Sequence, residues 1–239
     1  MQKSIEFYQA EKQKREQQLS EASKKLAVSS LLRLLVFLAM AVGIYYYFDN
    51  LQIAGPIAVL GIAIFIFLVS RHTNLKYNRD KIKELIQINE NEIEVLNRNF
   101  KHLPNGSEFE DPQHSFSQDI DLFGRGSFFQ YMNRTALREG ANKLAFFLKE
   151  NITSQILEKQ EAIKDLSEKP EWRQEFTAVA KLVKTETSSH QVLSWFREYK
   201  TFVPGHFKIT STIFSLISLA AIIAYGTGYI SGYHLFLWF

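Results

Sequence analysis

Two long stretches that are almost free of charge constrain this chain more than any other feature of its sequence. Residues 34–70 and 209–239 contain one charged side chain between them, Asp49. About 20 consecutive apolar residues are enough to cross a bilayer as a helix. The rest of the chain holds nearly all of its 28 Lys+Arg and 25 Asp+Glu, so its near-neutral mean hydropathy averages two extremes. The composition therefore indicates a membrane protein with water-facing segments rather than one soluble domain.

The first apolar stretch divides into two candidate spans. Residues 27–48 carry one charge, Arg33, near the start where its long side chain can reach the headgroups, and they end in aromatic residues typical of a membrane interface. Asp49 and Asn50 form a short turn before a second uncharged run, residues 51–70. We therefore predict a transmembrane hairpin over residues 27–70. A buried hairpin of a soluble protein is the alternative.

Basic residues flank this hairpin on both sides and are absent from its turn. They are Lys24, Lys25 and Arg33 before or at its entry, and Arg71, Lys76, Arg79, Lys81 and Lys83 after it. By the positive-inside rule, both polar arms then face the cytoplasm. We expect a multi-pass membrane protein with a cytoplasmic module, and the lipid bilayer is its first expected partner.

The polar segments beside the hairpin are predicted to be helical. Residues 1–26 carry a weak heptad pattern, in which Lys12 and Arg15 fall on the seam. Residues 71–103 include a helix whose apolar side is formed by Ile82, Leu85, Ile86, Ile93 and Leu96. Each arm runs for about 25 residues, or about 37 Å. We predict that they pair as an antiparallel coiled-coil stalk. A solvated N-terminal helix without a partner is the alternative.

Residues 104–205 form a predicted soluble module that is mainly helical. Pro104 ends the helix before it, and no long stretch alternates with period two. Ser127 and Gln130 have capping-box spacing at the start of one helix, and Pro170 fits the first turn of another. Residues 206–239 supply a third span and the start of a fourth, which stops inside an apolar run, so we expect a longer protein. The predicted fold class is all-α.

Few residues of this chain suggest catalysis. It has no Cys, which excludes disulfides, Cys-based metal sites and thiol nucleophiles, and no Gly-Lys pair, which excludes a Walker-type phosphate loop. The densest polar cluster is Asp111, His114, Asp119 and Asp121. Its spacing matches no metal-binding loop, so we predict turns and caps there, with a metal or acid/base site as the alternative. We predict no catalytic, cofactor-binding or metal site in this chain.

Aromatic residues are frequent in the predicted module. Those considered for stacking on nucleic-acid bases are Phe128, Phe129, Tyr131, Phe146 and Phe147. No interleaved basic residues form a groove pattern around them. We therefore predict that they pack in the core.

A run of residues in the module carries a family resemblance. It consists of Asp119, Asp121, Leu122, Phe123, Ser127, Asn133, Arg134 and Thr135, followed by Gly140 and Leu144. This pattern resembles the start of the core domain of the MutS mismatch-repair family, and residues 160–166 resemble a later family segment. Asp111, His114 and residues 172–174 are similar to a membrane-anchored bacterial branch. The likeness spans about residues 106–182.

The resemblance implies a helical scaffold that, in complete members, links a DNA-engaging end to a C-terminal ATPase using ATP and Mg²⁺. We expect the anchoring and core part of such a DNA mismatch repair protein in the bacterial inner membrane. It would be non-catalytic in these residues, with DNA as a partner by resemblance and a homodimer left open. Ala136 and Leu137 stand where the family has a second Thr, and the mismatch-reading and ATPase domains are missing from these residues. The alternative is a membrane-anchored interaction scaffold with no DNA role.

Overall fold

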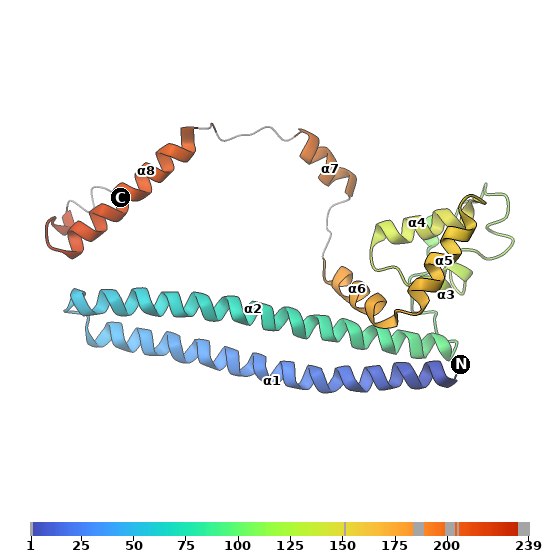
Figure 1. Ribbon diagram of the computed structural model, residues 1–239, viewed down its shortest axis with the longest axis horizontal. Helices are drawn as coiled ribbons and strands as arrows, with labels where there is room; N and C mark the ends of the chain where they lie inside the picture. Colours follow the sequence, from blue (N-terminus) through green and yellow to red (C-terminus); the bar gives the residue numbers. More distant parts are fainter. Residues whose placement is uncertain (1, 151, 184–188, 199–203, 205, 234–239) are drawn as a thin grey trace. The chain divides into compact units, whose positions relative to one another are not determined.

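The computed structural model describes residues 2–150, 152–183, 189–198, 204 and 206–233, and every regular element among them is a helix. The elements are α1 (Gln2–Tyr46), α2 (Leu51–Leu96), the short 3₁₀ helix η1 (Ser107–Phe109), α3 (Phe128–Met132), α4 (Arg138–Lys149), α5 (Ile156–Ser167), α6 (Pro170–Leu182), α7 (Ser189–Glu198) and α8 (His206–Gly226) (Figure 1). The predicted all-α class is confirmed for this part of the chain.

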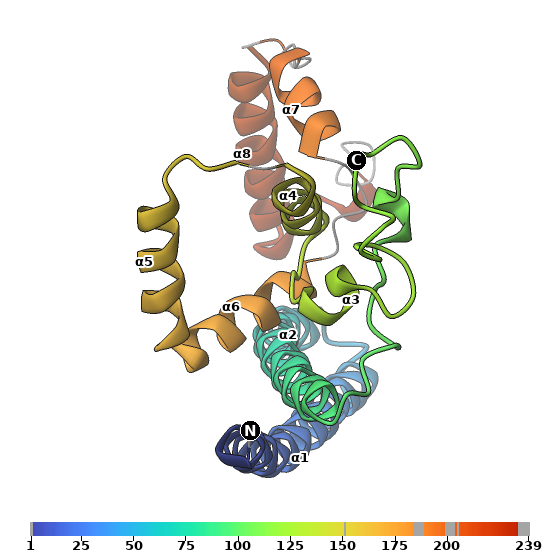
Figure 2. The same cartoon turned by 90° about the vertical axis from the view of Figure 1, so that its right-hand side faces the viewer.

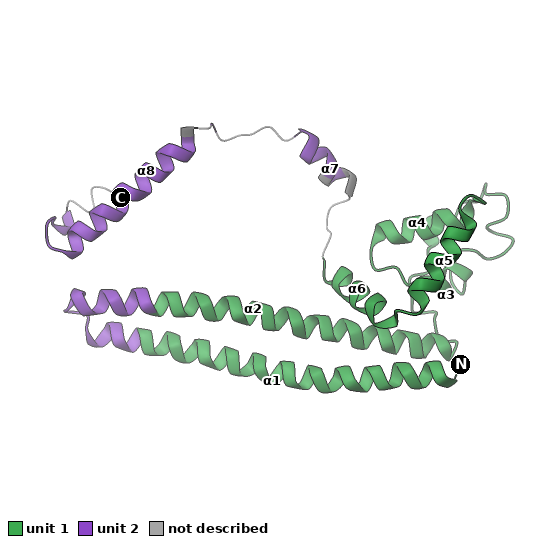
Figure 3. Cartoon of the chain, in the orientation of Figure 1, with its two compact units in different colours: residues 1–40, 61–184 green, residues 41–60, 185–239 purple. Residues whose placement is uncertain are grey.

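The chain divides into two compact units (Figure 3). Unit 1 comprises Met1–Met40 and Gly61–Lys184, and so contains most of α1 and α2 together with α3 to α6. Unit 2 comprises Ala41–Leu60 and Thr185–Phe239, and so contains the turn between α1 and α2 as well as α7 and α8.

Three helices are long and apolar enough to cross a membrane: α1, α2 and α8. Protein covers little of their apolar stretches among the described residues, since the buried share is 6% in α1, 17% in α2 and 0% in α8. A hairpin in the core of a soluble protein would be covered, because apolar surface left in water is costly. The low coverage by protein therefore favours membrane association over the alternative of a buried hairpin.

The second apolar run and the polar helix after it form one continuous helix, α2, of 46 residues. The helix ends at Leu96, inside the predicted segment 71–103. Arg98 adopts a left-handed φ of 63°, and the backbone N–H of Asn99 returns to the carbonyl of Glu94 at 2.9 Å. These features close a helix C-terminus by satisfying carbonyls that have no partner further along the chain.

Helices α1 and α2 lie side by side in both views (Figures 1 and 2). In their polar parts, Lys12 Nζ lies 2.7 Å from Glu90 Oε1. In their apolar parts, a Cβ atom on Gly61 would lie 2.6 Å from Sδ of Met40, closer than real Cβ contacts. Glycine therefore permits the close approach of the two helices at that level.

The large aromatic residues of α6 do not form its buried face. The helix begins at Pro170, as predicted, but it buries Gln174, Ala178 and Ala180. Trp172 and Phe176 are 55% and 59% exposed. The buried face of α6 carries small residues and the amide of Gln174. Helix α6 lies close to α2 (Figure 2), and Gln174 forms a hydrogen bond with Asn89 of α2.

Helices α7 and α8 lie in unit 2. Helix α8 begins at His206, where the segment of the predicted third span begins, and ends at Gly226. Thr227 Oγ1 donates to the Ile223 carbonyl at 2.9 Å just beyond this end. Residues 234–239 of the predicted fourth span lie outside the described residues.

Candidate functional site

The run of motif residues from Asp119 to Leu144 lies within residues 105–149, which we call the node. Its hydrophobic core consists of Leu122, Phe123, Phe129 and Ala145, with Phe109, Ala141, Leu144 and Leu148 partly buried around them. The rings of Phe109, Phe123 and Phe129 pack with centroids 5.4 to 5.9 Å apart. Tilted contacts at such distances are favourable for aromatic rings. The node is thus a small globular unit built around three phenylalanines.

Ser127 and Gln130 hold the loop before α3 in place. Ser127 Oγ accepts a hydrogen bond from the Gln130 backbone N–H at 3.1 Å, so the predicted cap is confirmed. The Gln130 side chain does more than a capping box requires. Its Oε1 accepts from the Gly126 N–H at 2.7 Å, and its Nε2 donates to the carbonyls of Lys101 at 3.2 Å and Leu103 at 2.5 Å. One buried amide therefore joins α3 to the segment that leaves α2.

Gly106 lies at this junction, against the ring of Phe129. Its φ is +71°, a left-handed conformation that favours glycine, and a Cβ atom there would lie 2.5 Å from the Phe129 ring. Phe129 is fully buried. The chain therefore turns directly over the central ring of the node, which a side chain at residue 106 would prevent.

Asn133, Thr135 and Gly140 meet in the turn before α4. Asn133 Oδ1 accepts hydrogen bonds from the Thr135 backbone N–H at 2.9 Å and from its hydroxyl at 2.7 Å. A Cβ atom on Gly140 would lie 3.3 Å from Thr135 Cβ. Asn133 is buried, and its side chain replaces backbone partners in the turn. These three motif residues thus form a tight turn that is held by the Asn133 side chain.

The motif residues divide into buried and exposed groups. Leu122, Phe123, Ser127 and Asn133 are buried, and Thr135, Gly140 and Leu144 are half-buried. Asp119, Asp121 and Arg134 are exposed. Arg134 donates to the carboxylate of Glu92 on α2, with Nε 2.6 Å from Oε1. The motif therefore supplies both the packing of the node and one of its links to α2.

The acidic cluster forms turns at the edge of an open pocket. Asp111 Oδ1 accepts from the Gln113 N–H at 3.0 Å, and His114 Nδ1 accepts from the Ser117 N–H at 3.2 Å. The predicted turn-and-cap roles are confirmed for these two residues. The pocket, of about 380 Å³, is lined by Glu110, Asp111, Ser117, Gln118, Asp121, Phe123, Gly124 and Arg125.

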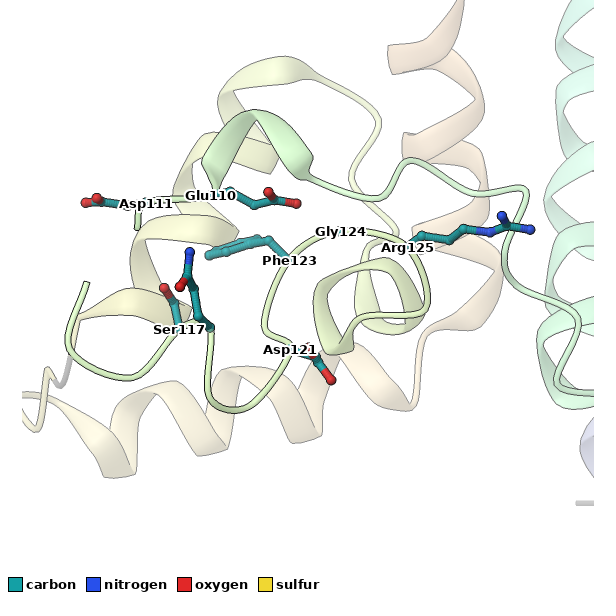
Figure 4. Close-up of a pocket in the computed structure, with 8 residues that line it drawn as sticks. Glu110, Asp111, Ser117, Asp121, Phe123, Gly124 and Arg125 are labelled. Atoms are coloured by element: carbon teal, nitrogen blue, oxygen red, sulfur yellow. The ribbon is translucent and has the colours of Figure 1, made fainter. Parts of the chain in front are cut away.

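The charged groups around this pocket do not converge. Figure 4 shows the side chains of Asp111, Asp121 and Arg125 pointing in three different directions. Among the described residues, no three His, Asp or Glu side chains are placed to hold a metal ion. No arrangement within the part of the chain that the structure describes supports the metal alternative for residues 111–121.

Helix α6 is joined to α2 by a buried pair of side-chain amides. Asn89 Nδ2 donates to Gln174 Oε1 at 3.2 Å, and Gln174 Nε2 donates to Asn89 Oδ1 at 3.0 Å. Asn89 also donates to the Leu85 carbonyl at 2.7 Å and is fully buried. A reciprocal pair of this kind satisfies both amides and fixes their relative position, because each buried polar group requires a partner.

Charged pairs surround this amide pair. Lys81 Nζ lies 2.9 Å from Glu175 Oε2, and Arg15 Nη1 of α1 lies 4.0 Å from the other oxygen of Glu175. The three helices thus meet around one carboxylate. Partly exposed pairs contribute little stability singly, so their main effect is to set which residues face one another.

Two pKa values report on the contact between α1 and α2. The hydrogen bond to Glu90 raises the pKa of the Lys12 ammonium above its ordinary value of 10.5. Burial, with the nearby charge of Glu92, raises the pKa of the Tyr8 hydroxyl above 10.0. In both cases the pairing of the helices favours the protonated form.

The aromatic residues of the node do not all pack in its core. The prediction is confirmed for Phe129 and wrong for Phe128, Tyr131, Phe146 and Phe147, which are 43% to 50% exposed. Lys143 Nζ lies 4.8 Å and 4.7 Å from the ring centroids of Phe146 and Phe147, and Lys159 Nζ lies 5.2 Å from that of Phe147. Basic and aromatic groups therefore do meet on this surface, although they are brought together from two helices.

The amide pair of Asn89 and Gln174 was not predicted from the sequence. The signal for Asn89 was present, because it interrupts the apolar side of α2 at the position between Leu85 and Ile93. A polar residue at a buried helical position requires a partner. Nothing in the sequence indicated that the partner is Gln174, 85 residues further along the chain.

Comparisons with protein-family models, with curated proteins and with solved structures find no match to this chain. The resemblance to the MutS family therefore rests on the sequence pattern alone and stays a prediction.

Proposed function

We propose that this chain is the membrane-anchoring and helical core part of a MutS-like, DNA-repair-type ATPase, and that these residues perform no catalytic step. The observation that carries the proposal is the node. Among the residues that resemble the family motif, Leu122 and Phe123 belong to the core of the node. Ser127 caps α3, and Asn133 and Thr135 form the hydrogen-bonded turn before α4. A motif whose members share one packed cluster is consistent with a scaffold role.

The anchor in this proposal is a transmembrane hairpin formed by the apolar parts of α1 and α2. Their polar parts continue into the cytoplasm of a bacterial cell as a paired stalk, and α8 provides a further span. The proposal is supported by the bases beside the apolar stretches, such as Lys25 and Arg71, and by the absence of bases in the turn. The ion pair between Lys12 and Glu90 supports pairing of the two arms.

The absence of Cys allows this topology to be tested directly. Asn50→Cys places a thiol in the turn between α1 and α2, and Gln113→Cys places one in the exposed loop of the node. In intact cells, a membrane-impermeant maleimide should label the first variant and reach the second only after permeabilisation. Equal labelling of both positions in intact cells would contradict the proposed orientation.

The proposed DNA role is supported by the surface at Phe146 and Phe147. Exposed rings stack on bases, and lysines beside them contact phosphates. The full chain in detergent should bind duplex or single-stranded DNA in a fluorescence anisotropy titration at low salt. Lys143→Gln with Lys159→Gln should weaken this binding by about 10-fold or more.

The matched control removes two charges elsewhere in the module. Lys164→Gln with Lys181→Gln changes net charge equally, and no aromatic contact is found for either lysine in the described residues. Its affinity should change much less. Equal losses in both variants would indicate diffuse attraction, and absence of binding to any DNA would contradict the proposed role of these residues.

The ATPase part of the proposal concerns residues outside this chain. A phosphate-binding loop of the pattern Gly-x-x-x-x-Gly-Lys-Ser/Thr, encoded in the same reading frame as these residues and able to hold ATP and Mg²⁺, would support this part of the proposal. A stop codon directly after Phe239, with no such domain encoded beside it, would overturn the connection to an ATPase.

An interaction scaffold with no DNA role is the second candidate. It is favoured by Trp172 and Phe176, whose rings stack with centroids 5.4 Å apart on the exposed face of α6. Exposed aromatic residues are enriched where proteins bind one another. Crosslinking to a protein partner or a second copy that is lost in Trp172→Ala, together with no DNA binding, would favour this candidate.

A further inference from the structure

Helix α7 presents an apolar side that the described part of the protein leaves exposed. Leu193 and Phe196 lie three residues apart and therefore share one side of the helix. Trp195 lies beside Phe196, with their ring centroids 5.2 Å apart. Leu193, Trp195 and Phe196 are 56%, 59% and 67% exposed. Ser194 and Arg197 lie on the other side, so α7 is amphipathic.

A helix as short as α7 needs a surface to stabilise it. It has 10 residues, and isolated helices shorter than about 12–15 residues are marginal in water. None of its described side chains is buried. The helix is therefore expected to be stabilised where its apolar side meets an apolar surface, which a protein or a lipid bilayer can supply.

The position of α7 in the chain favours the bilayer. Helix α8 has 21 residues and is about 31 Å long, close to the thickness of the hydrocarbon core. When α8 spans the bilayer, its first turn at His206 therefore lies near one membrane surface. Only the seven residues 199–205 separate His206 from Glu198 at the end of α7. Because a connection of this length reaches at most about 28 Å, the apolar side of α7 stays within reach of lipid.

The charges and side-chain types of this region favour the same surface. Arg197 in the last turn of α7 and Lys208 in the first turn of α8 outnumber Glu198, the carboxylate of α7. Basic side chains close to an anionic membrane surface are attracted to it. Trp, Phe and Leu opposite a base are typical of helices that lie in the interface, and Trp is enriched at that depth.

We propose that α7 lies flat in the cytoplasmic interface of the membrane, next to the point where α8 enters the bilayer. The inference rests on the proposed spanning role of α8. Leu193, Trp195 and Phe196 insert about 5–10 Å into the boundary between headgroups and acyl chains. Arg197 faces the anionic headgroups and neutralises their charge.

The test places nitroxide spin labels on the full chain in nanodiscs of phosphatidylcholine with phosphatidylglycerol. The chain has no Cys, so Phe196→Cys, Ser194→Cys and Ile213→Cys each carry one label. Oxygen concentrates in lipid and a nickel chelate stays in water, so the ratio of their collision rates reports the surroundings of each label. The ratio should be high at residue 196, low at residue 194, and high at residue 213 within α8.

Each kind of surroundings gives a different result. A label at residue 196 that is shielded from both oxygen and nickel would mean that a protein surface covers α7. A label that collides mainly with nickel would mean that the apolar side lies in water, and a high ratio at residue 194 would mean that lipid surrounds α7 on all sides. Any of these results overturns the proposal. A low ratio at residue 213 would instead contradict the spanning role of α8 itself.

A second variant measures the contribution of the apolar side. With the label at Leu193→Cys, Phe196→Ser should lower the equilibrium constant for binding of α7 to the interface about 10-fold, because it removes the burial of an aromatic ring. The loss is seen as a mobile, nickel-accessible population of the label. Gln191→Ser, on the polar side, is the matched control and should leave the spectrum unchanged. Equal losses would contradict the proposed orientation of the helix.

The charge of α7 is tested by lipid composition. Arg197→Gln should lower the same equilibrium constant about 5-fold in discs that contain phosphatidylglycerol and change it much less in phosphatidylcholine alone. An equal effect in both discs would assign the loss to the stability of the helix and would contradict the contact of Arg197 with anionic headgroups.

Discussion

The node and the pair of long helices are stabilised in different ways. The node buries large apolar side chains, above all Phe129 and Leu122, within a segment that is largely loop and turn. Helices α1 and α2 satisfy their backbone internally and bury few side chains, among which Ser29 and Asn89 are polar. A loop-rich segment needs an apolar core to order it, whereas a long helix needs only a few contacts to choose its neighbour.

This difference predicts how each region responds to substitution. The node should lose stability when its core is reduced, in proportion to the apolar volume removed. The helix pair should stay helical and change mainly in how its members face one another. The experiments below test this contrast, from the largest expected effect to the smallest.

Phe129→Ala should have the largest effect. It removes a fully buried ring from the centre of the node, and such substitutions cost about 3–5 kcal/mol. Phe128→Ala is the control, because the neighbouring ring is 50% exposed and should contribute less than about 1 kcal/mol. Pulse proteolysis of residues 105–149 at graded urea concentrations measures both. Equal sensitivity of the two variants would mean that the node has no defined core.

Asn89→Leu and Gln174→Leu should each destabilise the junction of α2 and α6 by about 1–3 kcal/mol, because each leaves a buried amide without its partner. The double variant should recover part of this loss, since no unpaired amide remains. Trp172, two residues from Gln174, reports unfolding of α6 by fluorescence. Additive losses in the double variant would show that the two amides act independently.

Gly61→Val should separate α1 from α2 in their apolar parts, because any side chain at residue 61 meets Met40. Overpacking of this kind costs about 1–3 kcal/mol, reduced here by the flexibility of the methionine. Gly55→Val is the control, since a Cβ atom there meets nothing within 4 Å. Crosslinking of cysteines introduced on the two helices should fall only in the Gly61 variant. Loss of helix content in the Gly61 variant would contradict the expectation that α1 and α2 stay helical when their packing is disturbed.

Alkaline pH should weaken the contact between the polar parts of α1 and α2 by the smallest amount. The folded-state pKa values of Tyr8 and Lys12 lie above 10.0 and 10.5. Their contribution is therefore complete below about pH 10 and is lost as pH rises through the raised values. Spin labels on cysteines introduced at Lys3 and Asn97 should then report larger and broader distances.

Tyr8→Phe with Lys12→Arg provides the control for this titration. Phenylalanine does not ionise, and arginine keeps its charge and its pair with Glu90 far above pH 10. The distance in this variant should be insensitive to pH over the same range. An unchanged alkaline transition would assign it to other groups.

The sequence determined the elements of this protein to a large extent. Uncharged runs located α1, α2 and α8, and the positions of Ser127 and Pro170 predicted the starts of α3 and α6. These features depend on neighbouring residues and on the cost of exposing charge to lipid or apolar groups to water. They can therefore be deduced from residues a few positions apart.

The functional surface was predicted less well, because the same residue types serve both core and surface. Phe128 and Phe129 are adjacent and chemically identical, yet one is exposed and the other is fully buried. Lys159 reaches Phe147 from another helix, so sequence spacing gave no sign of that basic and aromatic group.

The sequence by itself determined that this chain is helical, apolar in three segments and free of cysteine chemistry. Only the tertiary structure decided that Asn89 pairs with Gln174 and that Lys12 pairs with Glu90. Both outcomes depend on register, which is the relative position of helices that are distant in the chain. Periodicity fixes which side of a helix is apolar, but the energy that selects a neighbour comes from contacts made only after the helices meet.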